Sequence, residues 1–206
     1  MIEIKLYEYD ADSIEAAIRT AGCQQIGMFE DILPIGARWA VSQSPKEAAA
    51  ALAKWHALGV RSVLEIGTYT GGFARFMAEV MGWDVVSIDV NLPDNPPRGF
   101  TFVHKQSGQY EPERRFDLVY IDGDHRYESV KADYERFAPY ADKVVALHDV
   151  LGNHDCEGVR RLFNEIRSDD WTVEVSTDWP LGIAWREVAA SDEETPEPVK
   201  RKGSKR

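Results

Sequence analysis

The sequence predicts an α/β fold, with parallel strands in one central sheet and helices on both of its faces. Short apolar segments such as 61–67 and 116–122 alternate along the chain with longer segments of helical periodicity. Strands that are covered on both faces form continuous apolar runs, and strands that alternate with helices pair in parallel. Two of the apolar segments also end in charged residues, as "DLVYIDGDHRY" at 117–127 does, which places a candidate site at one edge of the sheet.

The composition indicates one globular domain that acts on a small molecule. A chain of 206 residues with 44% hydrophobic residues can bury one core. It has no apolar run of about 18 residues and does not begin like a signal peptide, so we expect a cytoplasmic protein with no membrane partner. Its formal net charge of -11 disfavours a nucleic-acid partner, and its two cysteines are too few for a disulfide framework.

Residues 1–43 are expected to form a strand, a helix and a covering segment before the sheet begins. Residues 2–9 alternate between apolar and polar side chains, as in a strand. Residues 10–22 begin with Asp and Ser residues and stop at a glycine, which is typical of a short helix. Residues 23–41 are irregular, and we interpret them as a cover over the site.

A domain at 44–188 should contain the sheet. Its first helix, 44–59, is predicted from Ser44 as the cap, Pro45 in the first turn and Glu47 as the second half of a capping box. The strands and helices that follow are expected at 61–67, 72–82, 84–90, 100–106, 116–122, 127–140, 143–149 and 157–168.

The end of the chain should complete the sheet and then leave it. Segments 171–177 and 181–187 are separated only by "DWP", so they should form an antiparallel pair of strands at one edge. Residues 189–206 carry acidic residues followed by basic ones, with almost no apolar side chain. Such a segment cannot bury enough surface to become ordered, so we expect a disordered tail.

The turn after the first predicted strand is a candidate ligand site. Gly67 and Gly71 let a ligand approach the backbone, and the following helix offers unpaired N–H groups. Tyr69 stands where the dinucleotide fingerprint has its second glycine, so a pyrophosphate fits poorly there. Asp89 ends the next strand and suits ribose hydroxyls. A purely structural tight turn explains the glycines about equally well, and Asp89 favours the ligand site.

Several stretches resemble motifs of a known family. They are "EIGTYTGGF" at 65–73, "VVSIDV" at 85–90, and further along "FDLVYIDGDHRYESVKADYERFAPY", "VALHDV" and "GVRRLFNEI". Together they resemble the class I S-adenosylmethionine-dependent methyltransferases, in the small-molecule O-methyltransferase branch that includes macrocin O-methyltransferases and cephalosporin hydroxylase-like proteins. The resemblance covers residues 42–186. It implies a Rossmann-like three-layer sandwich whose seven-stranded sheet has the order 3-2-1-4-5-7-6, with strand 7 antiparallel.

The resemblance also implies S-adenosylmethionine as the cofactor. By this resemblance the glycine turn would line the methionine side, Asp89 would hold the ribose, and the turn at Gln106 would lie near the adenine. The cofactor-binding residues that it implies are Glu65, Gly67, Thr68, Tyr69, Gly71, Asp89, Val90, Gln106, Ser107 and Asp122.

The charged strand ends are best explained as a catalytic site. Asp122, Asp124 and His125 follow one predicted strand, and His148 and Asp149 end another. Because the carboxyl ends of parallel strands meet at one edge, these ionisable groups should converge. Converging charges repel one another unless a cation or a substrate lies among them.

Two uses of this cluster stay open. In relatives that depend on a metal, the matching residues imply Asp122, His148 and Asp149 as ligands of a divalent ion and His125 as the general base. Many relatives have an acidic residue where His148 stands, so Mn, Fe or Zn would suit the site better than Mg. Without a metal, His125 would still act as the base, oriented by Asp122 or Asp124, although Asp124 could instead cap the next helix.

We therefore expect an enzyme that methylates a hydroxyl of a small molecule. The alternatives are a protein of the same fold that binds the cofactor without turnover, or a nicotinamide-dependent oxidoreductase. Acceptor specificity should depend on 23–41 and on the loop 151–158, whose His154, Asp155 and Cys156 we do not expect to bind a metal. The oligomeric state is left open, with a homo-oligomer as one alternative.

Overall fold

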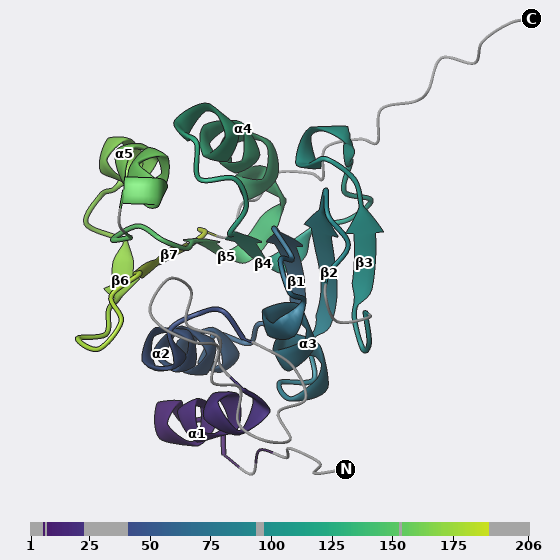
Figure 1. Ribbon diagram of the computed structural model, residues 1–206, viewed down its shortest axis with the longest axis vertical. Helices are drawn as coiled ribbons and strands as arrows, with labels where there is room; N and C mark the ends of the chain where they lie inside the picture. Colours follow the sequence, from purple (N-terminus) through teal and green to yellow (C-terminus); the bar gives the residue numbers. More distant parts are fainter. Residues whose placement is uncertain (1–5, 7, 23–40, 94–96, 153, 190–206) are drawn as a thin grey trace, which may run out of the picture.

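A seven-stranded sheet with the order β3-β2-β1-β4-β5-β7-β6 forms the centre of the fold (Figure 1). The computed structural model describes residues 6, 8–22, 41–93, 97–152 and 154–189. Strands β1 to β5 pair in parallel, and β7 is antiparallel to both β5 and β6, which confirms the predicted order and the predicted antiparallel strand. The strands are β1 (Ser62–Ile66), β2 (Asp84–Asp89), β3 (Thr101–His104), β4 (Phe116–Ile121), β5 (Ala141–Leu147), β6 (Thr172–Glu174) and β7 (Ile183–Glu187).

Helices cover both faces of the sheet and give the three layers of a Rossmann-like fold (Figure 1). One face carries α2 (Pro45–Ala57) and α3 (Gly72–Glu79), with α1 (Ala11–Ala21) packed on the outside of α2. The other face carries α4 (Tyr127–Phe137) and α5 (Glu157–Ile166). Three short 3₁₀ helices are η1 (Ser107–Gln109), η2 (Ala138–Tyr140) and η3 (His154–Cys156). No helix in these described ranges is long and apolar enough to cross a membrane.

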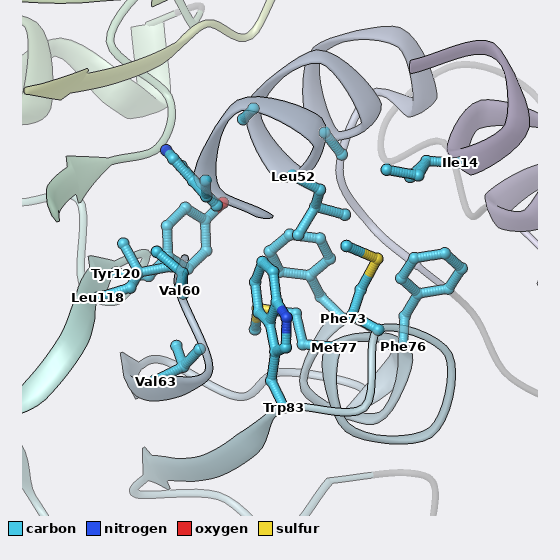
Figure 2. Close-up of a cluster of buried hydrophobic side chains, with 14 of the residues drawn as sticks. Ile14, Leu52, Val60, Val63, Phe73, Phe76, Met77, Trp83, Leu118 and Tyr120 are labelled. Atoms are coloured by element: carbon cyan, nitrogen blue, oxygen red, sulfur yellow. The ribbon is translucent and has the colours of Figure 1, made fainter. Parts of the chain in front are cut away.

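Strand β4 shows why the buried strands are continuous apolar runs. Its side chains alternate between the faces, so Leu118 and Tyr120 belong to the core cluster beneath α2 and α3, which also contains Leu52 (Figure 2). Val119 and Ile121 belong to the second cluster, beneath α4 and α5. All four are buried, because each face of the sheet is covered by helices.

Glu47 differs from its predicted role at the start of α2. It does not complete a capping box, since no side chain caps this helix. Its buried carboxylate instead accepts hydrogen bonds from the backbone N–H groups of Ser176, at 2.8 Å, and Gly182, at 2.9 Å. Two backbone donors from the β6–β7 loop lie against the helix start and occupy the carboxylate. Glu47 therefore anchors that loop to α2.

Two further expectations differ from the structure or fall outside it. The predicted strand at 2–9 is not seen at its described residues, because positions 6, 8 and 9 lie in no strand and Tyr9 stacks on His56. The turn between β6 and β7 is also longer than the three residues expected, since it runs over 175–182. The expected cover at 23–40 and the tail at 190–206 lie outside the described residues.

Candidate active site

A cavity of about 1060 Å³ lies at the carboxyl ends of the parallel strands, where the sequence places the site. Most of the predicted site residues line it. They are Glu65, Gly67, Thr68, Tyr69, Asp89, Val90, Gln106, Ser107, Asp122, Asp124, His125, His148 and Asp149. Gly71 is the exception: it does not line the cavity and instead begins α3 in a left-handed conformation, with φ 77°.

Gly67 holds three strand ends together. Its N–H donates to the carbonyl of Ile88 at the end of β2, at 2.8 Å. A Cβ at this position would lie 2.0 Å from the carbonyl oxygen of Asp122, which follows β4, and the residue has φ 96°. A side chain here would collide with the β4 turn, so glycine is required by close approach as well as by conformation.

Asp89 holds the backbone of the glycine turn. One carboxylate oxygen, Oδ2, accepts hydrogen bonds from the N–H groups of Thr68, at 2.8 Å, and Tyr69, at 3.0 Å. The other, Oδ1, accepts from the N–H of Asn91 at 2.8 Å. Because each carboxylate oxygen can accept about two hydrogen bonds, Oδ1 retains capacity for one more partner. Tyr69 itself is in the left-handed region, with φ 46°, at the position where this turn folds back.

Glu65 lies at the floor of the cavity as a buried acid. Its carboxyl group accepts a hydrogen bond from the hydroxyl of Ser87, which in turn lies 2.5 Å from the hydroxyl of Thr68. Burial raises the pKa of Glu65 well above its ordinary value, although the bond from Ser87 opposes this. The neutral carboxyl form of Glu65 is therefore favoured beside the glycine turn.

His148 lies between two carboxylates. Its Nδ1 is 3.0 Å from Asp122 Oδ1 and 3.2 Å from Asp149 Oδ2, and the amide of Gln43 donates to the other oxygen of Asp122 at 2.7 Å. Burial alone would lower the pKa of His148, but the two negative charges outweigh it and raise the pKa well above its ordinary value. The cluster thus binds positive charge between Asp122 and Asp149.

His125 is oriented by Asp149 and by a cysteine. Its Nε2 lies 3.0 Å from Asp149 Oδ2, and its Nδ1 lies 3.6 Å from Cys156 Sγ. The hydrogen bond to Asp149, followed by that to Cys156, raises the pKa of His125 to about 10. The ring is therefore protonated at neutral pH in this arrangement, and both of its nitrogens have partners.

Asp124 differs from its expected role. The sequence suggested that Asp122 or Asp124 would orient His125, whereas Asp149 does so. Asp124 instead accepts hydrogen bonds from the guanidinium of Arg126 and, more weakly, from its backbone N–H, and these lower the pKa of Asp124 to about 2 although burial opposes them. It does not cap α4, since the helix begins after Arg126 without a side-chain cap. The guanidinium of Arg126, two positions further along the chain, forms charge-assisted hydrogen bonds with the carboxylate of Asp124.

Several residues that line the cavity are not among the predicted site residues. Gln43, Cys156, Trp179 and Leu181 line the cavity but belong to no recognised motif. Gln43 precedes the first helix of the sheet domain, and the other three lie in loops after β5 and β6. Only the tertiary fold brings these segments to the strand ends. The one available signal was that the loop with Cys156 directly follows the charged end of β5.

Among the residues that the structure describes, two groups of side chains are close enough to hold a metal ion. In each group the candidate ligand atoms all lie within 4.8 Å of one another. The first is the predicted set, Asp122, His148 and Asp149, and the second is His125, Asp149 and Cys156. The imidazole and two carboxylates of the first set suit a transition ion better than magnesium. The fold therefore assembles the predicted ligands, with Asp149 common to both groups.

Comparison with known proteins agrees with this geometry. Residues 64–150 match the family model described as a methyltransferase domain. No curated protein matches the chain. Among solved structures, a provisionally named caffeoyl-CoA O-methyltransferase from Staphylococcus aureus is 13% identical, with a TM-score of 0.53 over 73% of this chain and 86% of that one. Cofactor-bound Rv0187 from MTB is 19% identical, with a TM-score of 0.50 over 66% of this chain and 76% of that one.

At these identities the solved structures establish the fold, and the family match covers the stretch from β1 to the end of β5. That stretch contains the glycine turn and Asp89. It also contains the ionisable cluster of Asp122, Asp124, His125, His148 and Asp149, but not Cys156. Over residues 64–150 the chain is therefore similar to a methyltransferase domain.

Proposed function

We propose that the protein transfers the methyl group of S-adenosylmethionine to a hydroxyl oxygen of a small molecule. The observation that carries this proposal is that the glycine turn with Asp89 and the ionisable cluster after β4 and β5 line the same cavity of about 1060 Å³. A cofactor at the turn and an acceptor at the cluster would share one enclosed space. Methyl transfer requires this arrangement, because the acceptor oxygen must align with the methyl group.

On the side of the cavity that contains the glycine turn, backbone groups and the carboxylate of Asp89 are proposed to bind the cofactor. Oδ1 of Asp89 would accept one hydrogen bond from a ribose hydroxyl. The other acceptor positions of this carboxylate already bind the backbone N–H groups of Thr68, Tyr69 and Asn91. The 3₁₀ turn with Gln106 and Ser107 would border the adenine, and the neutral carboxyl of Glu65 would lie beside the methionine part. A neutral acid there avoids the cost of burying a charge.

The acceptor side is proposed to take up the proton of the hydroxyl. His125 lies on the cavity wall with a third of its side chain exposed, so it can reach an acceptor. Its pKa of about 10 means that it must first lose its own proton. Asp149 is the main cause of that raised value, so His125 becomes a base once Asp149 is neutralised or turned away. Asp124 has no catalytic part in this proposal, because Arg126 occupies its carboxylate.

A divalent ion fits the group of Asp122, His148 and Asp149. The ligand atoms are close together, and Nε2 of His148 is buried without a hydrogen-bond partner among the described residues. An imidazole held this firmly by two carboxylates is typical of a metal ligand. When bound there, a divalent ion would polarise the acceptor hydroxyl and lower its pKa. Asp122, His148 and Asp149 would hold the ion, with His148 as the neutral imidazole.

A direct test begins with ligand binding. Calorimetry should show that the protein binds S-adenosylmethionine and does not bind a nicotinamide dinucleotide. The protein is then incubated with methyl-labelled S-adenosylmethionine and a panel of small hydroxyl compounds, with and without chelator and added Mn²⁺. Transfer of label to a hydroxyl is the expected result.

The other outcomes identify the alternatives. Tight cofactor binding without label transfer to any member of a broad panel would indicate a protein that binds the cofactor without turnover. Binding of the nicotinamide dinucleotide instead would indicate an oxidoreductase. Full activity after exhaustive chelation, with no ion found by metal analysis, would remove the metal from the proposal and leave the methyl transfer standing.

A further inference from the structure

We infer that His125, Asp149 and Cys156 form a second metal site, which takes a thiophilic divalent ion such as Zn²⁺ and shares Asp149 with the first group. One nitrogen, one carboxylate oxygen and the sulfur of these residues lie within 4.8 Å of one another. The inference goes beyond methyl transfer and does not require it; an ion bound there would occupy the imidazole of His125, which could then not act as the base. It differs from the expectation that His154, Asp155 and Cys156 bind no metal.

Packing directs Cys156 toward His125. A Cβ on Gly152 would lie 2.6 Å from Cys156 Sγ, so the sulfur lies directly over that glycine. A Cβ on Gly158 would lie 2.2 Å from the carbonyl oxygen of His125 and 2.3 Å from the N–H nitrogen of Tyr127. The first turn of α5 therefore lies against the backbone that carries His125. Two close glycine contacts fix the sulfur and the imidazole relative to each other.

Asp149 is held in an unusual conformation that serves both groups. Its φ of 61° lies in the left-handed region, which residues other than glycine rarely adopt. In this conformation Oδ2 lies 3.0 Å from His125 Nε2 and 3.2 Å from His148 Nδ1. Strained residues persist where the surrounding structure enforces them, and they gather at functional sites. The carboxylate thus lies between the two candidate metal groups.

The donor set selects the kind of ion. Sulfur, imidazole nitrogen and carboxylate oxygen together suit Zn²⁺ and Co²⁺, whereas Mg²⁺ and Ca²⁺ prefer oxygen ligands alone. On binding, the thiol of Cys156 and the imidazolium of His125 each lose a proton to solvent, and a sulfur–metal and a nitrogen–metal bond form. Cys156 is buried and His125 is partly exposed on the cavity wall, so an ion would enter from the cavity.

Cobalt gives a spectroscopic test that does not require activity. Co²⁺ added to the full-length protein should produce the near-ultraviolet absorption band of a thiolate–cobalt bond, and Zn²⁺ should abolish it by displacement. Cys156→Ser should lack the band. Cys23→Ser is the matched control and should keep it. Asp122→Asn should also keep it, because Asp122 belongs only to the first group.

Three results would overturn the inference: no band in the unaltered protein, a band that survives Cys156→Ser, or a band that is lost in Cys23→Ser. Alkylation provides a second measurement that needs no variant. Iodoacetamide modification of the Cys156 peptide should slow at least about tenfold with Zn²⁺ and stay unchanged with Mg²⁺. An equal rate with and without Zn²⁺ would exclude a sulfur–zinc bond at Cys156, even if every variant misfolded. Methyl transfer could still be observed after either failure.

Discussion

The two halves of the cavity are built in different ways. On the β1–β2 side, the N–H of Gly67 and the carboxylate of Asp89 form hydrogen bonds with backbone groups at the ends of two neighbouring strands. On the β4–β5 side, ionisable side chains meet from segments far apart, since Gln43 contacts Asp122 and Cys156 contacts His125. The first half depends on backbone shape and the second on charge. A small substitution on the β1–β2 side should therefore act through steric clashes. A small substitution on the β4–β5 side should act through the loss of charge.

The largest effect is expected from Asp149→Asn on the charged side. The variant keeps the shape but removes the charge that contacts both His125 and His148. Turnover of the metal-supported reaction should fall on the order of 100-fold or more, because a ligand and its orienting hydrogen bonds are lost together. Affinity for S-adenosylmethionine should stay within about twofold, since Asp89 and the glycine turn are untouched. Steady-state kinetics and calorimetry measure the two quantities.

Asp142→Asn is the matched control for that variant. Asp142 begins the same region of β5 but pairs with Arg115 at the opposite end of the strand, away from the cavity. Its loss should leave turnover unchanged, because a partly exposed ion pair contributes little. Equal losses of turnover in the two variants would mean that the charge of Asp149 has no special part in catalysis.

On the backbone side, Gly67→Ala should act mainly on stability. The new Cβ would lie 2.0 Å from the backbone oxygen of Asp122, at a residue with φ 96°. Strain and overpacking together should lower the free energy of unfolding by about 3 kcal/mol or more. Gly82→Ala is the control, since Gly82 has φ 72° but no atom within 4 Å of its Cβ position. It should cost only on the order of 1 kcal/mol.

Urea unfolding of both glycine variants measures this difference. Similar losses would show that conformation alone matters at Gly67 and that the β4 turn can move aside. A clear excess for Gly67→Ala would show that the turn is held against β1 by close packing. The cavity should then lose its shape on the cofactor side in that variant.

The contrast also explains what the sequence could predict. The antiparallel edge pair follows from periodicity, the strand order from the family resemblance, and the turn around Gly67 and Asp89 from local spacing, and all three are found as expected. The residues after β4 and β5 were also predicted to converge. The individual contacts of these residues were not predicted, because the contact of Asp149 with His125 depends on tertiary packing. The same holds for the anchoring of the β6–β7 loop by Glu47. Which charged group pairs with a side chain, as Arg126 does with Asp124, depends on the rotamers of both residues, and sequence spacing does not determine these.

A smaller effect is expected from Asp89→Ala, which tests whether the backbone half binds the cofactor. The variant removes one proposed ribose contact and frees the N–H groups of Thr68 and Tyr69. Affinity for S-adenosylmethionine should fall by about 2 kcal/mol, roughly 30-fold. Asp84→Ala is the control at the other end of β2, where the exposed carboxylate pairs with Arg114. Calorimetry with equal affinities for the two variants would remove Asp89 from the cofactor site.

The smallest effect is expected in the pH dependence of stability, through His125 on the β4–β5 side of the cavity. The pKa of His125 is raised to about 10, so the stabilisation from its contact with Asp149 is fully present below about pH 6.5, the ordinary histidine value. It should be lost as the pH rises toward 10. The amount should be on the order of 1 kcal/mol, because water screens a side chain that is a third exposed. The stability difference between the unaltered protein and His125→Gln should therefore shrink between pH 6.5 and 10.

His56 gives a control of opposite sign outside the cavity. Burial, followed by the charge of Arg61, lowers the pKa of His56, so its folded state favours the neutral ring. The contribution of that ring should be present above the ordinary histidine value and be lost as the pH falls below it. Urea unfolding of His125→Gln and His56→Gln across pH 5 to 10 should show the two differences changing in opposite directions. If the His125→Gln difference stays constant over this range, Asp149 does not hold the imidazole in its charged form, and His125 is already free to act as a base at neutral pH.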